Sequence, residues 1–274
     1  MSNPTPEFIQ VGALADGFAP DSLTLPRCAE LDGQSLRLCF DDDSAADCRL
    51  EPGGDARVVI VRPGLASTLA GVDGCHASSL RPGVYFLDFR HQGPAALSLS
   101  LVLDLTQRRF TLVRGNLPDA AAARICAFDR VAHQLELTGV DVEFLHGALD
   151  QPAAAVPPHP PSRDLIGMRN RYRYSPTECY EHIYLNDSFY AWHCLEGVER
   201  GLADVDRCHC LQVAERLYLF VWREKIIPTL GVILIDLEGM RTDGKIFGYQ
   251  DGDFGAARNF RVGAQASIVN HTRA

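Results

Sequence analysis

The sequence predicts an all-β protein made of two similar antiparallel halves. Three observations support this: two segments of the chain repeat each other, short runs of strand-forming residues alternate with turn signals, and helix signals are sparse. Many short strands in succession are typical of antiparallel barrels and sandwiches. Of these, a small closed barrel leaves no exposed strand edge and can enclose one small ligand. We therefore expect one barrel in each half.

The repeat is the strongest of the three observations. "LAGVDGCHASSLRPGVYFLDFR" (69–90) and "LADVDRCHCLQVAERLYLFVWR" (202–223) align without a gap at a constant offset of 133, with Tyr85 on Tyr218. One residue of slippage aligns the strand-like segments that follow as well. This much identity in one register indicates an internal duplication.

Each half shows a similar series of candidate strands. In the first half they lie at 35–42, 57–61, 83–89 and 97–105. In the second half they lie at 180–185, 189–195, 216–222, 231–237 and 245–249. Turn signals rich in Gly, Pro, Asn and Asp separate them. We expect residues 33–115 and 172–248 to form similar antiparallel barrels.

Two segments do not read as strands. "PDAAAARICAFDR" (118–130) is the best helix candidate, because Pro118 suits a first helical turn. Residues 151–163 contain five prolines, which cannot enter a helix or sheet interior, so this segment is predicted to be a linker. These features divide the chain into a first barrel at 1–150, the linker, and a second barrel at 164–274.

Composition excludes several classes of protein. The chain has 274 residues, is 46% apolar and carries a net charge of −9, and acidic residues outnumber basic ones in both halves. Phosphate backbones and anionic membranes require a basic excess, so we expect neither nucleic acid nor membrane as a partner. The start, "MSNPTPEFIQ", lacks the features of a signal peptide. Nine scattered cysteines indicate reduced thiols and a cytoplasmic protein.

Two motifs that suggest ligand chemistry are rejected. "GMRTDGKI" (239–246) is close to a phosphate-binding loop, but Ile246 stands where a Ser or Thr is needed and the context is a hairpin. "DRCHC" (206–210) suggests a metal site. On a strand, however, Cys208 and Cys210 share one face while His209 points to the other, so the three cannot converge. We expect no metal and no disulfide at these cysteines.

Long stretches of the second half resemble the C-terminal domain of the MoaF family. They are "ECYEHIYLND", "WHCLEGVERGLADVDRCH", "LYLFVWREKIIPTLGVILIDL" and "GKIFGYQDGDFG". The opening "FIQVGALADGFAPDSLTLP" resembles the start of the family's N-terminal domain, so the resemblance covers nearly the whole chain. The family is named for molybdenum cofactor biosynthesis, and its members are also linked to monoamine-responsive gene clusters. The resemblance implies no settled reaction.

A more distant resemblance links the second half to bacterial phenolic acid decarboxylases, which are lipocalin-like (calycin-type) barrels without a cofactor. Tyr172, Tyr174, Tyr180 and Glu181 stand at the spacing of that family's Tyr-x-Tyr and Tyr-Glu pairs. An Asn-Asp pair follows, and then "WRE", which ends in Glu224 and matches the family's Trp-x-Glu strand. The resemblance implies that the tyrosine pair binds a substrate carboxylate and that the glutamate handles a proton.

One position departs from the decarboxylase pattern. The arginine that binds the substrate carboxylate in that family falls near Leu202, which cannot bind an anion. Arg171 and Arg173 flank the tyrosines but lie on the opposite face of the strand. Decarboxylation of cinnamic acids therefore does not follow from the resemblance.

The alternation of residues 217–224 predicts where Glu224 points. Tyr218, Phe220, Trp222 and Glu224 share one strand face, which in a barrel would be the interior. A carboxyl group among aromatic rings resists ionisation and can serve as a general acid or base. The alternative is a glutamate at the strand end that reaches water and pairs with Lys225 or a neighbouring arginine. In the first half His91 takes the aligned position, so we expect that copy to lack the same site.

Together these arguments give a candidate site in the second barrel. The candidate catalytic residues are Glu224, Tyr172 and Tyr174, and the candidate ligand contacts are Trp222, Tyr218, Phe220, Tyr180 and His209. We expect a small aromatic or pterin-like ligand and no cofactor, and we keep a homodimer as an open alternative.

The predicted function is binding of a small aromatic compound, with cofactor-free lyase or isomerase chemistry as an extension. Two alternatives stay open. One is a non-catalytic binding or regulatory protein of a monoamine catabolic cluster, which a closed apolar pocket would favour. The other is a protein that handles a pterin or molybdenum cofactor intermediate, which a pocket rich in arginine or backbone amides would favour.

Overall fold

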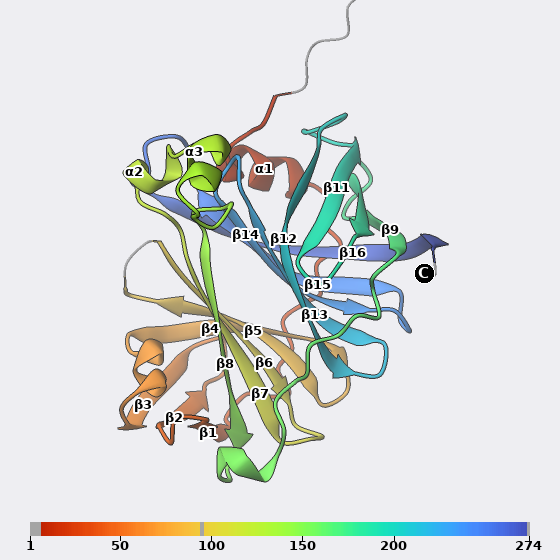
Figure 1. Ribbon diagram of the computed structural model, residues 1–274. Coiled ribbons are helices and arrows are strands. Elements are labelled where there is room, and N and C mark those ends of the chain that lie inside the picture. The colour runs from red at the N-terminus through yellow and green to blue at the C-terminus, as the bar shows by residue number, and fades with distance from the viewer. Residues whose placement is uncertain (1–6, 94–95, 273–274) are drawn as a thin grey trace, which may run out of the picture. The chain divides into compact units, whose positions relative to one another are not determined.

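A computed structural model describes residues 7–93 and 96–272, and the chain divides into two compact units (Figure 1). The C-terminal unit contains the described residues up to Thr24, residues 117–141, and the chain from Pro161 onward. The N-terminal unit contains residues 25–116 and 142–160. This division differs from the predicted ranges 1–150, 151–163 and 164–274, because two segments from the first half belong to the C-terminal unit.

The first of those segments forms helix α1 (Val11–Phe18), which the sequence analysis did not predict. Val11, Leu14 and Phe18 point from this helix into the hydrophobic core of the C-terminal barrel. The predicted helix at 118–130 consists of two short helices, α2 (Ala120–Ala123) and α3 (Ala127–Ala132). The carboxylate of Asp119 caps α2 by accepting a hydrogen bond from the Ala122 amide at 2.8 Å.

The N-terminal unit is a single antiparallel sheet of eight strands. The strands are β1 (Ser35–Phe40), β2 (Ala45–Leu50), β3 (Ala56–Arg62), β4 (Val72–Arg81), β5 (Val84–His91), β6 (Leu97–Asp104), β7 (Arg109–Asn116) and β8 (Asp141–Leu149). Their order is β3-β2-β1-β8-β7-β6-β5-β4. The two edge strands approach each other at one bridge, between Asp55 and Gly74, so this sheet is a barrel that stays open along most of one seam.

The C-terminal unit is a closed barrel of eight antiparallel strands (Figure 1). The strands are β9 (Met168–Arg173), β10 (Cys179–Tyr184), β11 (Phe189–Glu196), β12 (Ala203–Ala214), β13 (Leu217–Glu224), β14 (Thr229–Asp236), β15 (Arg241–Tyr249) and β16 (Ala257–His271). Their order around the barrel repeats the order of the first sheet strand for strand. The predicted all-β fold with two duplicated barrels is confirmed.

The duplication extends to individual contacts within each unit. Tyr85 and Tyr218 occupy the second position of the equivalent strands β5 and β13. The Tyr85 hydroxyl donates a hydrogen bond to Glu30 at 2.6 Å, and the Tyr218 hydroxyl donates one to Asp164 at 3.0 Å. In each unit the accepting carboxylate precedes the first strand. The two tyrosines therefore hold equivalent places, as the aligned sequences predict.

The structure agrees with the rejection of the phosphate-loop motif at residues 239–246. Residues 239–246 form the turn and the start of β15 in the β14–β15 hairpin, which is not the setting of a phosphate-binding loop. Across the described residues, no helix is long and apolar enough to cross a membrane. All nine cysteines lie in the described part of the chain and are free thiols.

Candidate functional site

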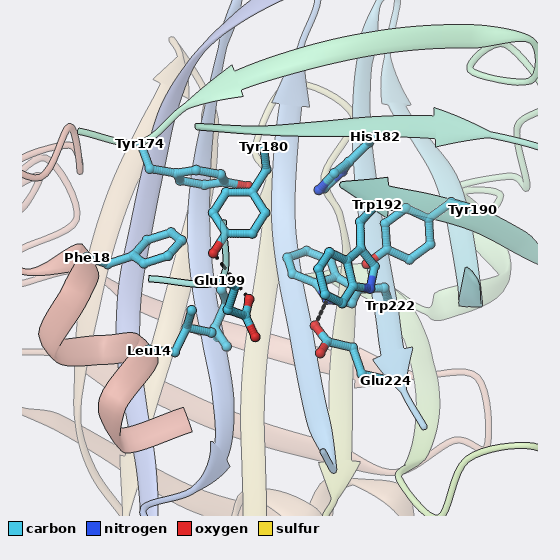
Figure 2. A pocket seen from close by; sticks show the side chains of 11 residues that line it. Leu14, Phe18, Tyr174, Tyr180, His182, Tyr190, Trp192, Glu199, Trp222 and Glu224 are labelled. Carbon is cyan, nitrogen blue, oxygen red and sulfur yellow. Dashed lines mark hydrogen bonds between the residues drawn. The ribbon is translucent and has the colours of Figure 1, made fainter. Parts of the chain in front are cut away.

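A pocket lies in the interior of the C-terminal barrel and is lined mainly by aromatic side chains (Figure 2). Its volume is about 30 Å³, which is room for two or three water molecules. The strands β10, β11 and β13 and the helix α1 all contribute to it. The lining residues with rings are Phe18, Tyr174, Tyr180, His182, Tyr190, Trp192 and Trp222.

Strand alternation explains why these rings converge. Along β10, Tyr180 and His182 point inward, whereas Glu181 between them points outward and pairs with Arg169 and Arg171. Along β11, Tyr190 and Trp192 are two residues apart and line the same pocket. Every second side chain of a strand lies on one face, so a polar–aromatic alternation places the rings inside the barrel.

Glu224 lies in this pocket at the end of β13, on the same side as Trp222. The Trp222 indole donates its Nε1–H to Glu224 Oε1 at 2.9 Å, and the Thr138 hydroxyl fixes the strand end through the Glu224 carbonyl at 2.8 Å. Burial, together with the negative charges of Asp206 and Glu199, raises the pKa of Glu224 well above its usual value. The side chain is partly buried, and its Oε1 is held by the Trp222 indole instead of pairing with Lys225 or an arginine.

A second carboxyl group, that of the buried Glu199, lines the pocket from the turn between β11 and β12. The Tyr180 hydroxyl donates a hydrogen bond to its Oε2 at 3.2 Å. Burial raises the pKa of Glu199 to about 7, and the nearby charge of Glu178 contributes in the same direction. At neutral pH this group is therefore close to half protonated, which suits proton transfer.

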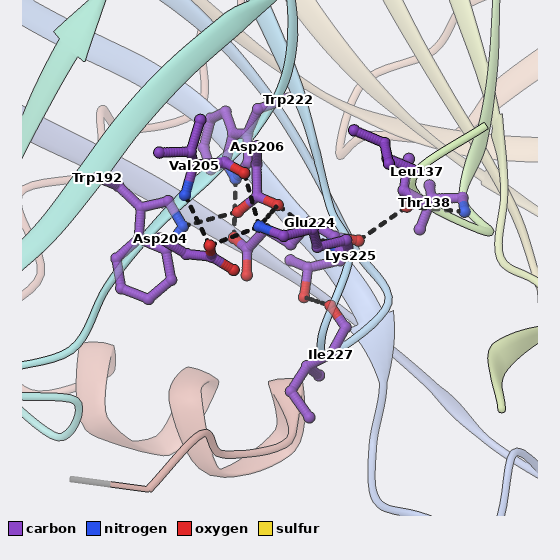
Figure 3. A network of polar contacts seen from close by, with 12 residues as sticks. Leu137, Thr138, Trp192, Asp204, Val205, Asp206, Trp222, Glu224, Lys225 and Ile227 are labelled. Carbon is purple, nitrogen blue, oxygen red and sulfur yellow. Dashed lines mark hydrogen bonds and ion pairs between the residues drawn. The ribbon is translucent and has the colours of Figure 1, made fainter. Parts of the chain in front are cut away.

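A third carboxyl group, that of Asp206 on β12, lies next to the tryptophans that line the pocket (Figure 3). Trp192 Nε1–H donates to Asp206 Oδ2 at 2.9 Å, and the Lys225 backbone amide donates to Oδ1 at 3.1 Å. The Lys225 ammonium contacts both Asp204 and Asp206, the latter at 3.4 Å. Lys225 therefore neutralises the aspartates rather than Glu224.

Tyr172 lies deeper in the barrel than Tyr174. It is fully buried and does not line the pocket; its ring lies edge-on to His182, with the centroids 4.8 Å apart. The Tyr172 hydroxyl bonds the Tyr184 hydroxyl at 2.7 Å and accepts from Asn170 Nδ2 at 3.1 Å. Burial raises the Tyr172 pKa to about 12. The structure thus brings Tyr174 to the pocket and places Tyr172 beneath it.

Phe220 and Tyr218 belong to the supporting core. Phe220 stacks on Trp222, with ring centroids 6.0 Å apart and an interplanar angle of 29°. Tyr218 uses its hydroxyl on Asp164. Neither side chain lines the pocket. Both pack in the core that supports the residues of the pocket.

His209 does not reach the pocket, so its selection as a ligand contact is corrected. On β12 it pairs with Val221, whose side chain alternates with the inward-facing Phe220 and Trp222. Burial and the neighbouring Arg223 lower the pKa of His209 to about 4. The physical reason is the period of two along the strand, which turns His209 away from the barrel interior.

The neighbouring cysteines face the other way. Cys208 belongs to the barrel core and Cys210 packs against it. The three side chains of "CHC" therefore do not converge. Within the described ranges, no group of three or more His, Cys, Asp or Glu side chains is placed to hold a metal ion.

Several pocket residues were missed by the sequence analysis. The alternation in "FYAWHC" was a usable signal for Tyr190 and Trp192. His182 lies two residues after Tyr180 on the same face and could have been found in the same way. Glu199 had no such signal, because it lies in a turn. Leu14 and Phe18 come from the unpredicted helix α1.

The arginines near the tyrosine pair face away from the pocket. Arg171 pairs with Glu181, and Arg173 pairs with Glu196 at 3.0 Å. Leu202, at the position of the decarboxylases' arginine, is buried in the barrel core. The pocket therefore differs from a carboxylate-binding site at the position that matters most for that chemistry.

Comparison with known proteins places the whole chain. Residues 6–119 match the family model described as the MoaF N-terminal domain, and residues 159–272 match the MoaF C-terminal domain. The chain is similar to Protein MoaF of Klebsiella aerogenes, with 51% identity over 267 residues, or 97% of each chain. A solved structure from Burkholderia vietnamiensis, named as a candidate beta-lactamase, covers 39% of this chain and 96% of its own at 15% identity and a TM-score of 0.33, which carries no argument.

Proposed function

The chain belongs to the MoaF family, and from that premise we propose that it binds a small aromatic molecule in the pocket of its C-terminal barrel. The observation that carries this proposal is the pairing of an aromatic pocket lining with two carboxyl groups, the buried Glu199 and the partly buried Glu224. Burying ionisable groups opposes folding unless they are paired. Their presence in a concave aromatic pocket therefore supports a binding site.

The chain carries its own reporter for this proposal. It has only two tryptophans, Trp192 and Trp222, and both line the pocket. A bound aromatic compound should change their emission in a saturable way. The test is a titration of small aromatic compounds into the full-length protein, with thermal unfolding measured in parallel.

Two variants localise the response. Trp192→Phe and Trp222→Phe should each keep the part of the response that comes from the remaining indole. Glu143→Gln, which changes a half-exposed glutamate of the N-terminal unit paired with Arg114, serves as the control and should leave the response unchanged. A ligand that stabilises the protein without altering the emission of either tryptophan would place the binding site elsewhere.

The same carboxyl groups favour proton transfer as a second candidate function. Glu199, whose pKa burial raises to about 7, can take up or release a proton near neutral pH. Glu224, whose pKa is raised further by burial, is a proton donor. This combination suits a cofactor-free lyase or isomerase, with Tyr174 as a pocket hydroxyl and Tyr172 as its support.

The catalytic candidate has its own test. Glu224→Gln keeps the shape of the side chain and its acceptor for Trp222, but removes the proton. Turnover of any substrate should fall by roughly 10²–10⁴-fold, the usual contribution of a general acid or base. Unchanged turnover in this variant would show that Glu224 is not the general acid or base.

The alternative of a pterin or molybdenum cofactor intermediate has less support. Among the described lining residues there is no arginine or lysine to hold a phosphate group. The free thiols of all nine cysteines, each in the described part of the chain, support a reducing compartment, and we propose the cytoplasm.

A further inference from the structure

We propose that the ligand of this pocket is an organic ammonium ion, whose charged nitrogen lies between Glu199 and Glu224 and against the indole and phenol rings. This inference rests on the proposed binding function and specifies the chemical class of the ligand. It is opposite in sign to the carboxylate ligands that the decarboxylase resemblance implies.

The charge of the pocket favours a cationic ligand. Glu199 and Glu224 both line the pocket, and neither has an ion pair with Lys or Arg among the described residues. The nearest ammonium group, that of Lys225, is taken by Asp204 and Asp206. The pocket therefore holds two carboxyl groups that only a proton or an incoming cation can neutralise.

The aromatic rings that line the pocket also favour a cation. The faces of tryptophan and tyrosine attract cations, and tryptophan attracts them most strongly. Trp192 and Trp222 come from two different strands, and Figure 2 shows both near the Glu224 carboxyl group. An ammonium ion in this pocket is therefore surrounded by aromatic rings as well as carboxyl groups.

His182 offers the ligand a hydrogen-bond acceptor. His182 is 3% exposed, and its Nδ1 has no hydrogen-bond partner among the residues that the structure describes. In Figure 2 the ring points toward the pocket. Burial lowers the pKa of His182 to about 3, so the imidazole is neutral and can accept an N–H from a ligand.

The remaining groups that face the pocket carry no positive charge. Tyr174, Tyr180 and Tyr190 present phenols whose pKa values are raised by burial, so all three stay neutral. The helix α1 and the strand β15 contribute only the apolar side chains Leu14, Phe18 and Ile246. No group in the described lining would repel a cation.

The size of the pocket sets how the rest of the ligand fits. The small volume of about 30 Å³ accepts an ammonium head group, and a ring beside it needs more room. The Phe18 ring from α1 lies 5.0 Å from Tyr174 and 5.6 Å from Tyr180, between centroids. An aromatic substituent on the ligand would take the place of this ring, with Phe18 moving aside.

Proton linkage makes the proposal testable. A bound cation favours the ionised carboxylates, so binding should release protons at pH 7. Affinity should rise by about tenfold between pH 6 and pH 8, because Glu199 loses its proton in that interval. Benzylammonium stays charged over this range and is a suitable probe.

The experiment compares benzylammonium with benzyl alcohol and benzoate, which have the same ring but no charge or the opposite charge. Binding to the full-length protein is measured by tryptophan emission and by calorimetry in two buffers of different ionisation enthalpy. We expect benzylammonium to bind most tightly at pH 8, with net proton release. Glu199→Gln should weaken that binding by about tenfold or more and remove the share of the pH dependence that comes from Glu199.

Two further variants complete the design. Phe18→Ala enlarges the pocket without changing its charge and should keep the preference for the ammonium ion. Glu143→Gln, on the N-terminal unit, should behave as wild type. Circular dichroism checks that each variant is folded.

The outcomes separate the two proposals. If benzyl alcohol or benzoate binds as tightly as benzylammonium, with a tryptophan response but no proton release, the cation proposal is overturned and the pocket remains the binding site. If none of the probes changes the tryptophan emission in wild type or in Phe18→Ala, the proposed binding function for small aromatic compounds fails together with the inference.

Discussion

The two barrels share one topology but have opposite interiors. At equivalent register positions the N-terminal sheet places smaller apolar residues inside, whereas the C-terminal barrel places larger aromatic residues and a histidine. The equivalent pairs are Leu38 and Tyr172, Ala46 and Tyr180, Cys48 and His182, Val58 and Trp192, and Phe89 and Trp222. Because the smaller apolar set already supports the same strand order, that order does not require the larger rings and the carboxyl groups of the C-terminal barrel. A role in function therefore explains these rings and carboxyl groups better than a role in stability.

The ends of the equivalent strands β5 and β13 show the same contrast. His91, which takes the place of Glu224, uses both ring nitrogens locally: Nε2 contacts the Leu97 carbonyl at 2.7 Å, and Nδ1 accepts from the Gly93 amide at 3.0 Å. His91 therefore holds a turn, whereas Glu224 faces a pocket. Positions 91 and 224 therefore share a place in equivalent strands, but their side chains have different roles.

The barrels also differ in closure. In the C-terminal barrel β11 pairs with β12 over Phe189–His193, while the equivalent β3 and β4 meet at a single bridge. A closed sheet fixes the positions of inward side chains all around its circumference. Closure therefore accompanies the barrel that holds the aromatic pocket.

The largest expected effect comes from giving the C-terminal barrel the aliphatic residue of its counterpart. Tyr172→Leu removes the hydroxyl that bonds both Tyr184 and Asn170, and it also leaves a void. We expect a loss of about 3–5 kcal/mol in the free energy of unfolding. Urea unfolding followed by tryptophan emission measures this, because both tryptophans are in the C-terminal barrel.

Tyr172→Phe is the matched control for that exchange. It removes only the hydroxyl and should cost about 1–2 kcal/mol. A loss below about 1 kcal/mol in Tyr172→Leu itself would show that the polar interior of this barrel adds nothing to its stability, and the contrast between the two interiors would lose its energetic meaning.

The next effect concerns pH. Burial raises the pKa of Glu199 to about 7, so the folded barrel favours its protonated form. This contribution to stability is complete below the ordinary pKa of about 4.5 and is lost as the pH rises through 7. We expect the wild-type barrel to lose up to about 3 kcal/mol from this group between pH 4.5 and pH 8.

Urea unfolding at several pH values measures this loss. Glu199→Gln should reduce the slope because it removes one of the two titrating carboxyl groups and leaves Glu224, while Glu143→Gln on the N-terminal unit should keep the wild-type slope. If Glu199→Gln retained that slope, the burial of Glu199 would not be what makes the barrel sensitive to pH.

Much of the fold could be predicted because the duplication preserved the lengths of strands and turns. The strands β5 and β13 each span eight residues, and the same alternation that defines them also placed Glu224 and Trp222 on the inner face. A strand's inward and outward positions follow from a local rule with a period of two. That rule also turned His209 outward, and its selection as a ligand contact went against the pattern.

The rest depended on tertiary contacts that no local pattern reveals. The helix α1 is only eight residues long and contains Gly12 and Gly17, which weaken any helix signal. Its place in the C-terminal unit follows from Phe18 and its neighbours packing in that barrel. Glu199 lies in a turn, where its burial depends on what packs over it and not on periodicity. The raised pKa of Glu199 was therefore out of reach of the sequence.

A smaller effect is expected from replacing Trp222 with the residue found at the equivalent position 89. Trp222→Phe keeps an aromatic ring over Phe220 but removes the Nε1–H donor to Glu224. We expect a loss of about 1–2 kcal/mol at pH 6 in urea unfolding, followed by the emission of Trp192. Unchanged stability would mean that this hydrogen bond contributes nothing to holding Glu224 in the pocket.

The smallest effect is expected from the reverse exchange, His91→Glu, which gives the N-terminal sheet the residue of the C-terminal site. The new carboxylate can still accept from the Gly93 amide, but it cannot donate to the Leu97 carbonyl, so about 1 kcal/mol of local stability should be lost. Amide hydrogen exchange across β5 and β6 measures this loss. No new dependence on pH should appear above pH 6, because the mainly aliphatic N-terminal interior provides neither the tyrosine- and tryptophan-rich lining nor the second carboxyl group that surround Glu224. If the variant gained a pH-dependent loss of protection near neutrality, the position in the duplicated strand alone would account for the properties of Glu224, and the distinction between the two interiors would not be the cause.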